Sequence, residues 1–116
     1  MRQIKIKRLY DAPAPEDGFR VLVDRLWPRG IAKEKAEIHH WAKEAAPSTE
    51  LRKWFHHDPE RWNEFERRYR AELATRTDLL REIVALGGDR PLTLLYSAKD
   101  RTHNQAVVLK DVLERI

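Results

Sequence analysis

The runs FRVLVD at residues 19–24 and LTLLY at residues 92–96 decide the fold of this 116-residue chain. Both runs are short, continuous and rich in Val or Leu, and prolines and glycines border them on the sequence. Such runs are typical of strands that are buried on both faces of a parallel sheet. We therefore expect the two runs to be central strands of an α/β domain.

Two further strands are predicted on either side of the first run. Residues 3–9 alternate apolar residues with lysine, which is the pattern of a half-buried strand. The loop at 11–18 looks too short to hold a helix, so the direction of this strand relative to the next stays open. Residues 36–42 fit either a short strand or part of a helix, and we favour the strand.

Helices are predicted between and after the strands. Ser48 is placed to cap a helix at 49–57, and an Asp-Pro pair at 58–59 opens a helix that runs to about residue 74. These signals combine a side-chain oxygen, which can accept from free backbone N–H groups, with a proline whose φ suits the first turn.

Two T-x-x-D or T-x-x-Q patterns predict further helix starts. The first, at 75–78, opens a helix to Leu86, and the second, at 102–105, opens a last helix with Ile116 on its inner face. Together the elements predict one small three-layer α/β/α domain over residues 1–116, with a short, mostly parallel sheet of three to four strands.

Composition sets bounds on function. The chain holds 23 Lys plus Arg against 19 Asp plus Glu, for a net charge of +4, which mildly favours anionic partners. It has no cysteine, which excludes disulfides, thiolate metal sites and a cysteine nucleophile. No apolar run reaches the roughly 20 residues of a membrane helix, and the first residues lack the apolar core of a signal peptide. We expect a cytoplasmic protein without a membrane partner.

Basic residues follow the predicted strands at their carboxyl ends, where open parallel sheets bind ligands. They are Arg8, Arg25, Arg29 and Lys99. Guanidinium groups bind carboxylate or phosphate through paired N–H donors, and the start of the last helix adds a favourable dipole. We therefore expect these side chains to bind an anionic small molecule, with phosphate the leading ligand. Structural ion pairs of the arginines with Asp24 or Glu34 remain the alternative.

Asp24, Ser97 and His103 are the candidates for a catalytic role. For Asp24 we favour holding an arginine or capping a turn over acting as a base, since an isolated Asp has a pKa of about 3.9. For Ser97 we favour a hydrogen-bonding role, because no G-x-S-x-G motif surrounds it. His103 is either an acid/base group or a solvated side chain, and both alternatives stay open.

Tyr96 and Asn104 are further ligand-binding candidates at the last strand end, with a place in the core as the alternative for Tyr96. The histidine pairs at 39–40 and 56–57 lack the H-x-x-x-H and H-E-x-x-H spacings of metal sites. The chain has neither a G-x-G-x-x-G motif nor a P-loop. We expect no metal and no cofactor.

A non-enzymatic module that binds nucleic acid or protein is the alternative function. The stretch RWNEFERRYRAEL at 61–73 mixes aromatic residues with arginines, as nucleic-acid binders do. Acidic residues balance its charge, which favours a solvated amphipathic helix. A protein-binding role would need an exposed apolar patch around Trp41 or Trp54.

The chain resembles the YeaO-like family of small bacterial proteins nearly end to end. The resemblance is carried by three strings, which are LVDRLWPRG at 22–30, KEAAPSTELRKWFHHDP at 43–59 and LTLLYSAKD at 92–100. The resemblance implies a compact α/β fold and brings no established activity, substrate or cofactor. Lys43 joins the ligand-binding candidates because it matches a family motif. More distant relatives often carry a cysteine near the last strand end, where this chain has Tyr96 and Ser97.

Overall fold

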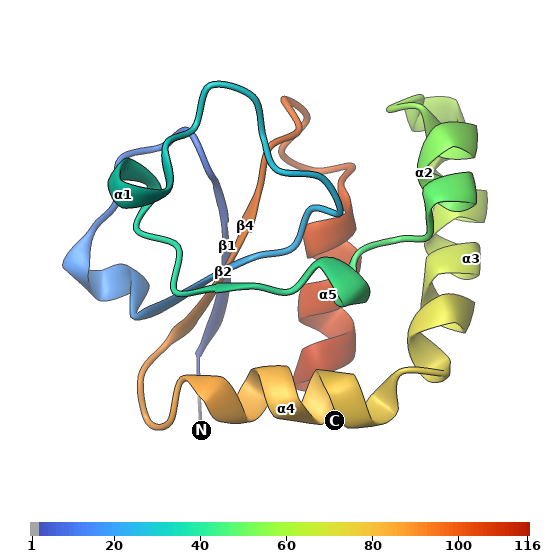
Figure 1. Ribbon diagram of the computed structural model, residues 1–116. Helices are drawn as coiled ribbons and strands as arrows, with labels where there is room; N and C mark the ends of the chain where they lie inside the picture. Colours follow the sequence, from blue (N-terminus) through green and yellow to red (C-terminus); the bar gives the residue numbers. More distant parts are fainter. Residues whose placement is uncertain (1–2) are drawn as a thin grey trace.

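The structure, a computed structural model, describes residues 3–116, and the strands within that range form a four-stranded, fully parallel sheet (Figure 1). The strands are β1 (Ile4–Arg8), β2 (Phe19–Leu22), β3 (His40–Trp41) and β4 (Leu92–Tyr96), and they lie in the order β1-β4-β2-β3. The last strand of the chain thus lies between the first two. The two apolar runs are central strands, as predicted. The direction of β1 relative to β2, which the sequence left open, is parallel.

The turn before β2 explains how a short connection joins two parallel strands that are not neighbours. It contains a single 3₁₀ turn, Pro15–Asp17, followed by Gly18 with a φ of 67°. A Cβ atom at Gly18 would lie 2.3 Å from the carbonyl oxygen of Pro91, the residue that precedes β4. Only glycine permits both this backbone conformation and this close approach.

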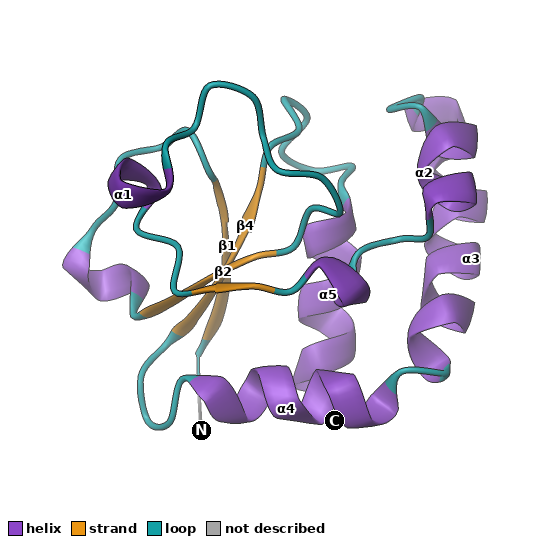
Figure 2. Ribbon diagram, viewed as in Figure 1, coloured by secondary structure: helices purple, strands orange, loops and turns teal. Residues whose placement is uncertain are grey.

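The helices cover the two faces of the sheet unequally (Figure 2). On one face α5 (Gln105–Glu114) packs against β1 and β4, and α3 (Trp62–Ala74) packs on α5. Beside them lie α2 (Thr49–Phe55) and α4 (Thr77–Leu86), whereas the opposite face carries the single-turn helix α1 (Lys33–Ala36). Within residues 3–116, no helix combines the length and apolarity that crossing a membrane requires.

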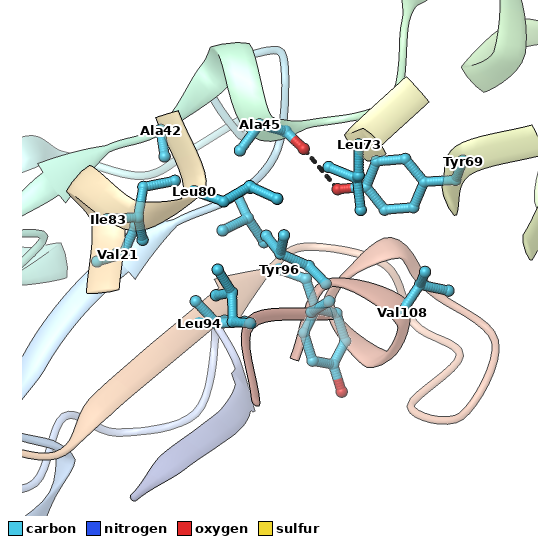
Figure 3. Packing of buried hydrophobic residues seen from close by; sticks show 14 of the residues in the cluster. Val21, Ala42, Ala45, Tyr69, Leu73, Leu80, Ile83, Leu94, Tyr96 and Val108 are labelled. Atoms are coloured by element: carbon cyan, nitrogen blue, oxygen red, sulfur yellow. Dashed lines mark hydrogen bonds between the residues drawn. The ribbon is translucent and has the colours of Figure 1, made fainter. Parts of the chain in front are cut away.

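Alternate residues of the central strands face two separate cores, as the pleat of a strand requires. Val21 and Leu94 belong to the larger core under α3, α4 and α5, which Figure 3 shows. Leu22 and Leu95 belong to the smaller core, which Ala36 of α1 and the nearby tryptophans cover. The three-layer α/β/α arrangement is therefore present, with a thin layer on the α1 side.

The larger core also fixes the segment that leads into α2. In Figure 3 the hydroxyl of the buried Tyr69, on α3, donates to the Ala45 carbonyl. Ser48 caps α2 as predicted, since its hydroxyl accepts from the Leu51 N–H at 3.2 Å. The Ser48 hydroxyl in turn donates to the Glu72 carboxylate. These bonds hold the start of α2 against α3.

Asp58 also caps as predicted, and the 3₁₀ turn Pro59–Arg61 leads directly into α3. The T-x-x-D pattern at 75–78 and the T-x-x-Q pattern at 102–105 were predicted to act as capping boxes, and both predictions are wrong. Thr75 donates back to the Glu72 carbonyl at the end of α3, so α4 begins without a side-chain cap. Asn104 takes the place of Thr102 as the cap of α5.

The end of the last helix also differs from the prediction. Ile116 was expected on the inner face with Ala106, Leu109 and Leu113. It lies beyond α5 and is 49% exposed, whereas the other three residues are buried.

Candidate functional site

A pocket of about 280 Å³ opens at the carboxyl edge of the sheet, between the segments that follow β2 and β4 and the helix α2. This is the edge at which open parallel sheets bind ligands, and at which the sequence predicted a site. Its lining includes polar side chains from the two strand ends, three arginines and several aromatic rings.

Asp24 is the acidic residue of this lining, and it comes two residues after the end of β2. Ser97 comes directly after β4. Because β2 and β4 are neighbouring parallel strands, the two residues meet, and the Ser97 hydroxyl donates to the Asp24 carboxylate. Gln105, the first residue of α5, donates to the other carboxylate oxygen at 2.5 Å.

Burial raises the pKa of Asp24 above its ordinary value of 3.8. The hydrogen bonds from Ser97 and Gln105, and the charge of His57, oppose this rise without cancelling it. Asp24 was expected to hold an arginine or to cap a turn. In the part of the chain that the structure describes, its side-chain partners are instead the neutral groups of Ser97 and Gln105.

Arg25 and Arg29 both line the pocket, as the sequence predicted for the anion site. They differ in their hydrogen bonds. Arg25 donates through Nε to the Pro47 carbonyl at 2.8 Å and through Nη2 to the Ala46 carbonyl at 3.2 Å. It therefore ties the segment before α2 to the end of β2. The exposed guanidinium of Arg29 makes no hydrogen bond or ion pair to residues 3–116. Neither arginine pairs with Asp24 or Glu34.

Arg52, on α2, supplies a third guanidinium that the sequence-based site did not include. Its Nε is buried and has no hydrogen-bond partner among the described residues. A buried donor without a partner costs about 1–3 kcal/mol, so native proteins seldom keep one without a reason. The one sequence signal for Arg52 is its place in the string at 43–59 that carries the family resemblance.

Aromatic residues form part of the pocket lining. Phe55 of α2 and Phe65 of α3 stack with their ring centroids 4.2 Å apart, and both line the pocket together with Trp27. His57 contributes to the rim from a left-handed backbone with a φ of 55°, directly after His56 with a φ of 47°. Two successive non-glycine residues with a left-handed backbone conformation are uncommon.

The remaining candidates from the strand ends lie outside the pocket lining. Arg8 donates through Nε to the Ala98 carbonyl at 3.0 Å, and so supports the connection that carries Ser97. Lys99 is exposed, and Lys43 is exposed with its ammonium 5.2 Å from the centre of the Trp41 ring. Tyr96 is 2% exposed and belongs to the larger core.

Asn104 and His103 are engaged at the start of α5. The Asn104 side chain is buried, accepts from the N–H groups of Ala106 and Val107, and donates to the Asp100 carbonyl at 3.0 Å. The Nδ1 of His103 lies 3.0 Å from the Asp100 carboxylate. Residues 3–116 contain no group of three or more His, Asp or Glu side chains arranged to hold a metal ion.

Comparisons with known proteins agree with the resemblance seen in the sequence. Residues 3–116 match the family described as "Inactive DUF488-N3 subclade". The uncharacterised protein YeaO of Escherichia coli (strain K12) is 47% identical over 113 residues, which cover 97% of this chain and 98% of that protein. The uncharacterised protein Rv3073c of Mycobacterium tuberculosis is 40% identical over 111 residues, or 96% of this chain and 93% of that protein. No solved structure matches the chain.

Proposed function

Because the chain belongs to the YeaO-like family and matches a subclade described as inactive, we propose that it binds a small phosphate- or carboxylate-bearing molecule without transforming it. The ligand occupies the pocket at the carboxyl edge of the sheet. The ligand-binding residues are Arg25, Arg29 and Arg52, together with polar groups at the end of β4.

One observation carries this proposal: three arginines line one pocket, and none of them pairs with a carboxylate in residues 3–116. Arginines near the edge of a sheet often form structural ion pairs, which would leave no charge for a ligand. Here the cations are unneutralised, and the Nε of Arg52 is buried without a partner. An anion would supply acceptors to the side chains of Arg29 and Arg52, which have none in residues 3–116, whereas Arg25 already donates to two carbonyls.

The chemistry of the pocket favours a small ligand over a polymer. Guanidinium groups present paired donors that match the oxygens of phosphate and carboxylate. A volume of about 280 Å³ lies near the lower end of small-molecule pockets. Partial exclusion of water in such a pocket strengthens the attraction between an anion and the arginines.

The polar groups favour binding over catalysis. A serine nucleophile needs a base that takes its proton and a further group that orients the base. The Ser97 hydroxyl donates to Asp24, and no histidine in the described residues bonds to either side chain. His103, the acid/base candidate, is instead held beside Asp100.

Thermal unfolding with added inorganic phosphate tests the proposal. Phosphate should raise the Tm of the wild-type protein, because a ligand that binds the folded state stabilises it. Arg52→Met should weaken phosphate binding about tenfold or more, since a charged hydrogen bond is worth roughly 1.5–3 kcal/mol.

The matched control is Arg81→Met, which removes an equally charged residue from the exposed face of α4. This variant should keep the wild-type response to phosphate. The proposal fails if phosphate does not stabilise the wild type, or if it stabilises Arg52→Met as strongly.

The alternative, a module that binds nucleic acid or protein, gains no support from the tryptophans. Neither Trp41 nor Trp54 is among the exposed large apolar side chains of residues 3–116. The guanidinium groups of Arg61 and Arg68 lie over the Trp54 ring, at 5.2 and 4.3 Å from its centre.

A further inference from the structure

Unneutralised charges of both signs face the same pocket. Asp24 lines it together with the arginines, yet within the described chain its carboxylate forms no ion pair with them, and His57, which also lines the pocket, acts on it through its charge without bonding to it. Its partners, Ser97 and Gln105, are neutral. The fold therefore keeps a half-buried carboxylate and several guanidinium groups in one cavity without joining them.

The surroundings of Asp24 hold its carboxylate in one orientation. Ser97 approaches one oxygen from the end of β4, and Gln105 approaches the other from the first turn of α5. The backbone N–H of Ser97 is a third donor. A carboxylate has about four lone-pair positions, so these three donors leave acceptor capacity unused. A fixed acceptor that retains this capacity is what a preorganised binding site needs.

A bare anion binds such a pocket but uses only one of its two sets of charged groups. It would gain from the arginines but would be repelled by Asp24, and the half-buried carboxylate would still lack a cationic partner. A ligand with a positive and a negative end would satisfy both sets of groups at once. Phe55, Phe65 and Trp27 would face the carbon atoms that join the two ends.

We infer that the ligand is dipolar, with an ammonium group that binds Asp24 and a phosphate or carboxylate group that binds the arginines. This inference rests on the proposed function, because it adds a second recognition point to the same pocket. It names Asp24 as the residue that selects among anions, and Ser97 and Gln105 as the residues that position it.

Isothermal titration with matched probes tests the inference. Phosphoethanolamine and propyl phosphate have the same anion and differ in whether the chain ends in an ammonium or a methyl group. The amino acid β-alanine and butyrate form the corresponding carboxylate pair. The wild-type protein should bind the ammonium member of at least one pair about tenfold more tightly, which is the effect of one charge-assisted hydrogen bond. The pair with the higher affinity identifies the anion.

Asp24→Asn should abolish this preference by weakening the ammonium member of the pair. Its affinity for propyl phosphate should stay the same or rise, because a like charge has been removed. Asp78→Asn, which removes a fully exposed carboxylate from α4, is the matched control and should keep the wild-type preference.

The outcomes separate the two proposals. Equal binding of both members of each pair by the wild type overturns the inference and leaves the anion site standing. A preference that survives in Asp24→Asn also overturns it, since the ammonium would then bind elsewhere. Failure of all four probes to bind refutes the proposed function as well. The wild-type comparison remains decisive even if Asp24→Asn does not fold.

Discussion

Asp24 makes the stability of the fold depend on pH in a direction that can be worked out. Burial raises its pKa above 3.8, so the folded state holds this proton more tightly than the unfolded state does. The stability that protonation contributes is therefore complete below about pH 3.8. It is lost as the pH rises through the raised pKa of the folded state.

Asp24→Asn cannot ionise, and it should escape this loss. We predict that its free energy of unfolding, relative to that of the wild type, increases as the pH rises above about 3.8 and then levels off. Urea denaturation of both proteins at a series of pH values measures the difference. The other acidic groups are present in both proteins, so their titration largely cancels. A difference that shrinks as the pH rises would contradict the prediction.

Arg25 links two elements as well as lining the pocket, and this dual role separates it from Arg29. Its guanidinium binds the carbonyls of Pro47 and Ala46, and so attaches the segment before α2 to the end of β2. Arg29 is exposed and its guanidinium makes no such bond within residues 3–116.

Arg25→Met should lower the free energy of unfolding by about 1–3 kcal/mol, because two hydrogen bonds to carbonyls are lost. Arg29→Met should change it by less than about 0.5 kcal/mol, as exposed substitutions usually do. Both variants should weaken phosphate binding. Urea denaturation together with phosphate titration measures the two effects separately. Equal stability of the two variants would show that the link made by Arg25 does not hold the elements together.

The starts of α2 and α3 could be predicted from sequence because their caps are local. Ser48 and Asp58 accept from N–H groups two or three residues away, and the distant bond of Ser48, to Glu72, uses the hydroxyl hydrogen and leaves the oxygen free to accept. The later capping boxes failed where competition exists. Thr75 bonds to the end of the preceding helix, and Gln105 reaches Asp24, which is far away in sequence. A local pattern cannot reveal such a partner.

The strand order of the whole molecule limits what the sequence could predict of the site. The strand ends predicted that Arg8, Arg25, Arg29 and Lys99 would converge near Asp24 and Ser97. Asp24, Arg25, Arg29 and Ser97 line the pocket, whereas Arg8 and Lys99 lie outside its lining. That β4 lies between β1 and β2 could not be seen from local patterns. Arg52 comes from a helix that tertiary packing brings to the edge, and no strand end marks it.

The net charge of +4 provides a test that separates the pocket from the basic surface as a whole. Arg52→Met and Arg81→Met each lower this charge to +3. Non-specific binding of single-stranded RNA depends on the number of phosphates neutralised, so both variants should weaken it by the same small factor, with similar salt slopes. Binding of inorganic phosphate should fall in Arg52→Met alone.

Fluorescence anisotropy with a labelled oligonucleotide at several salt concentrations measures the effect on RNA binding. If Arg52→Met selectively reduced both RNA affinity and the salt slope, the pocket would be part of a polynucleotide track, and the nucleic-acid alternative would replace the small-molecule proposal.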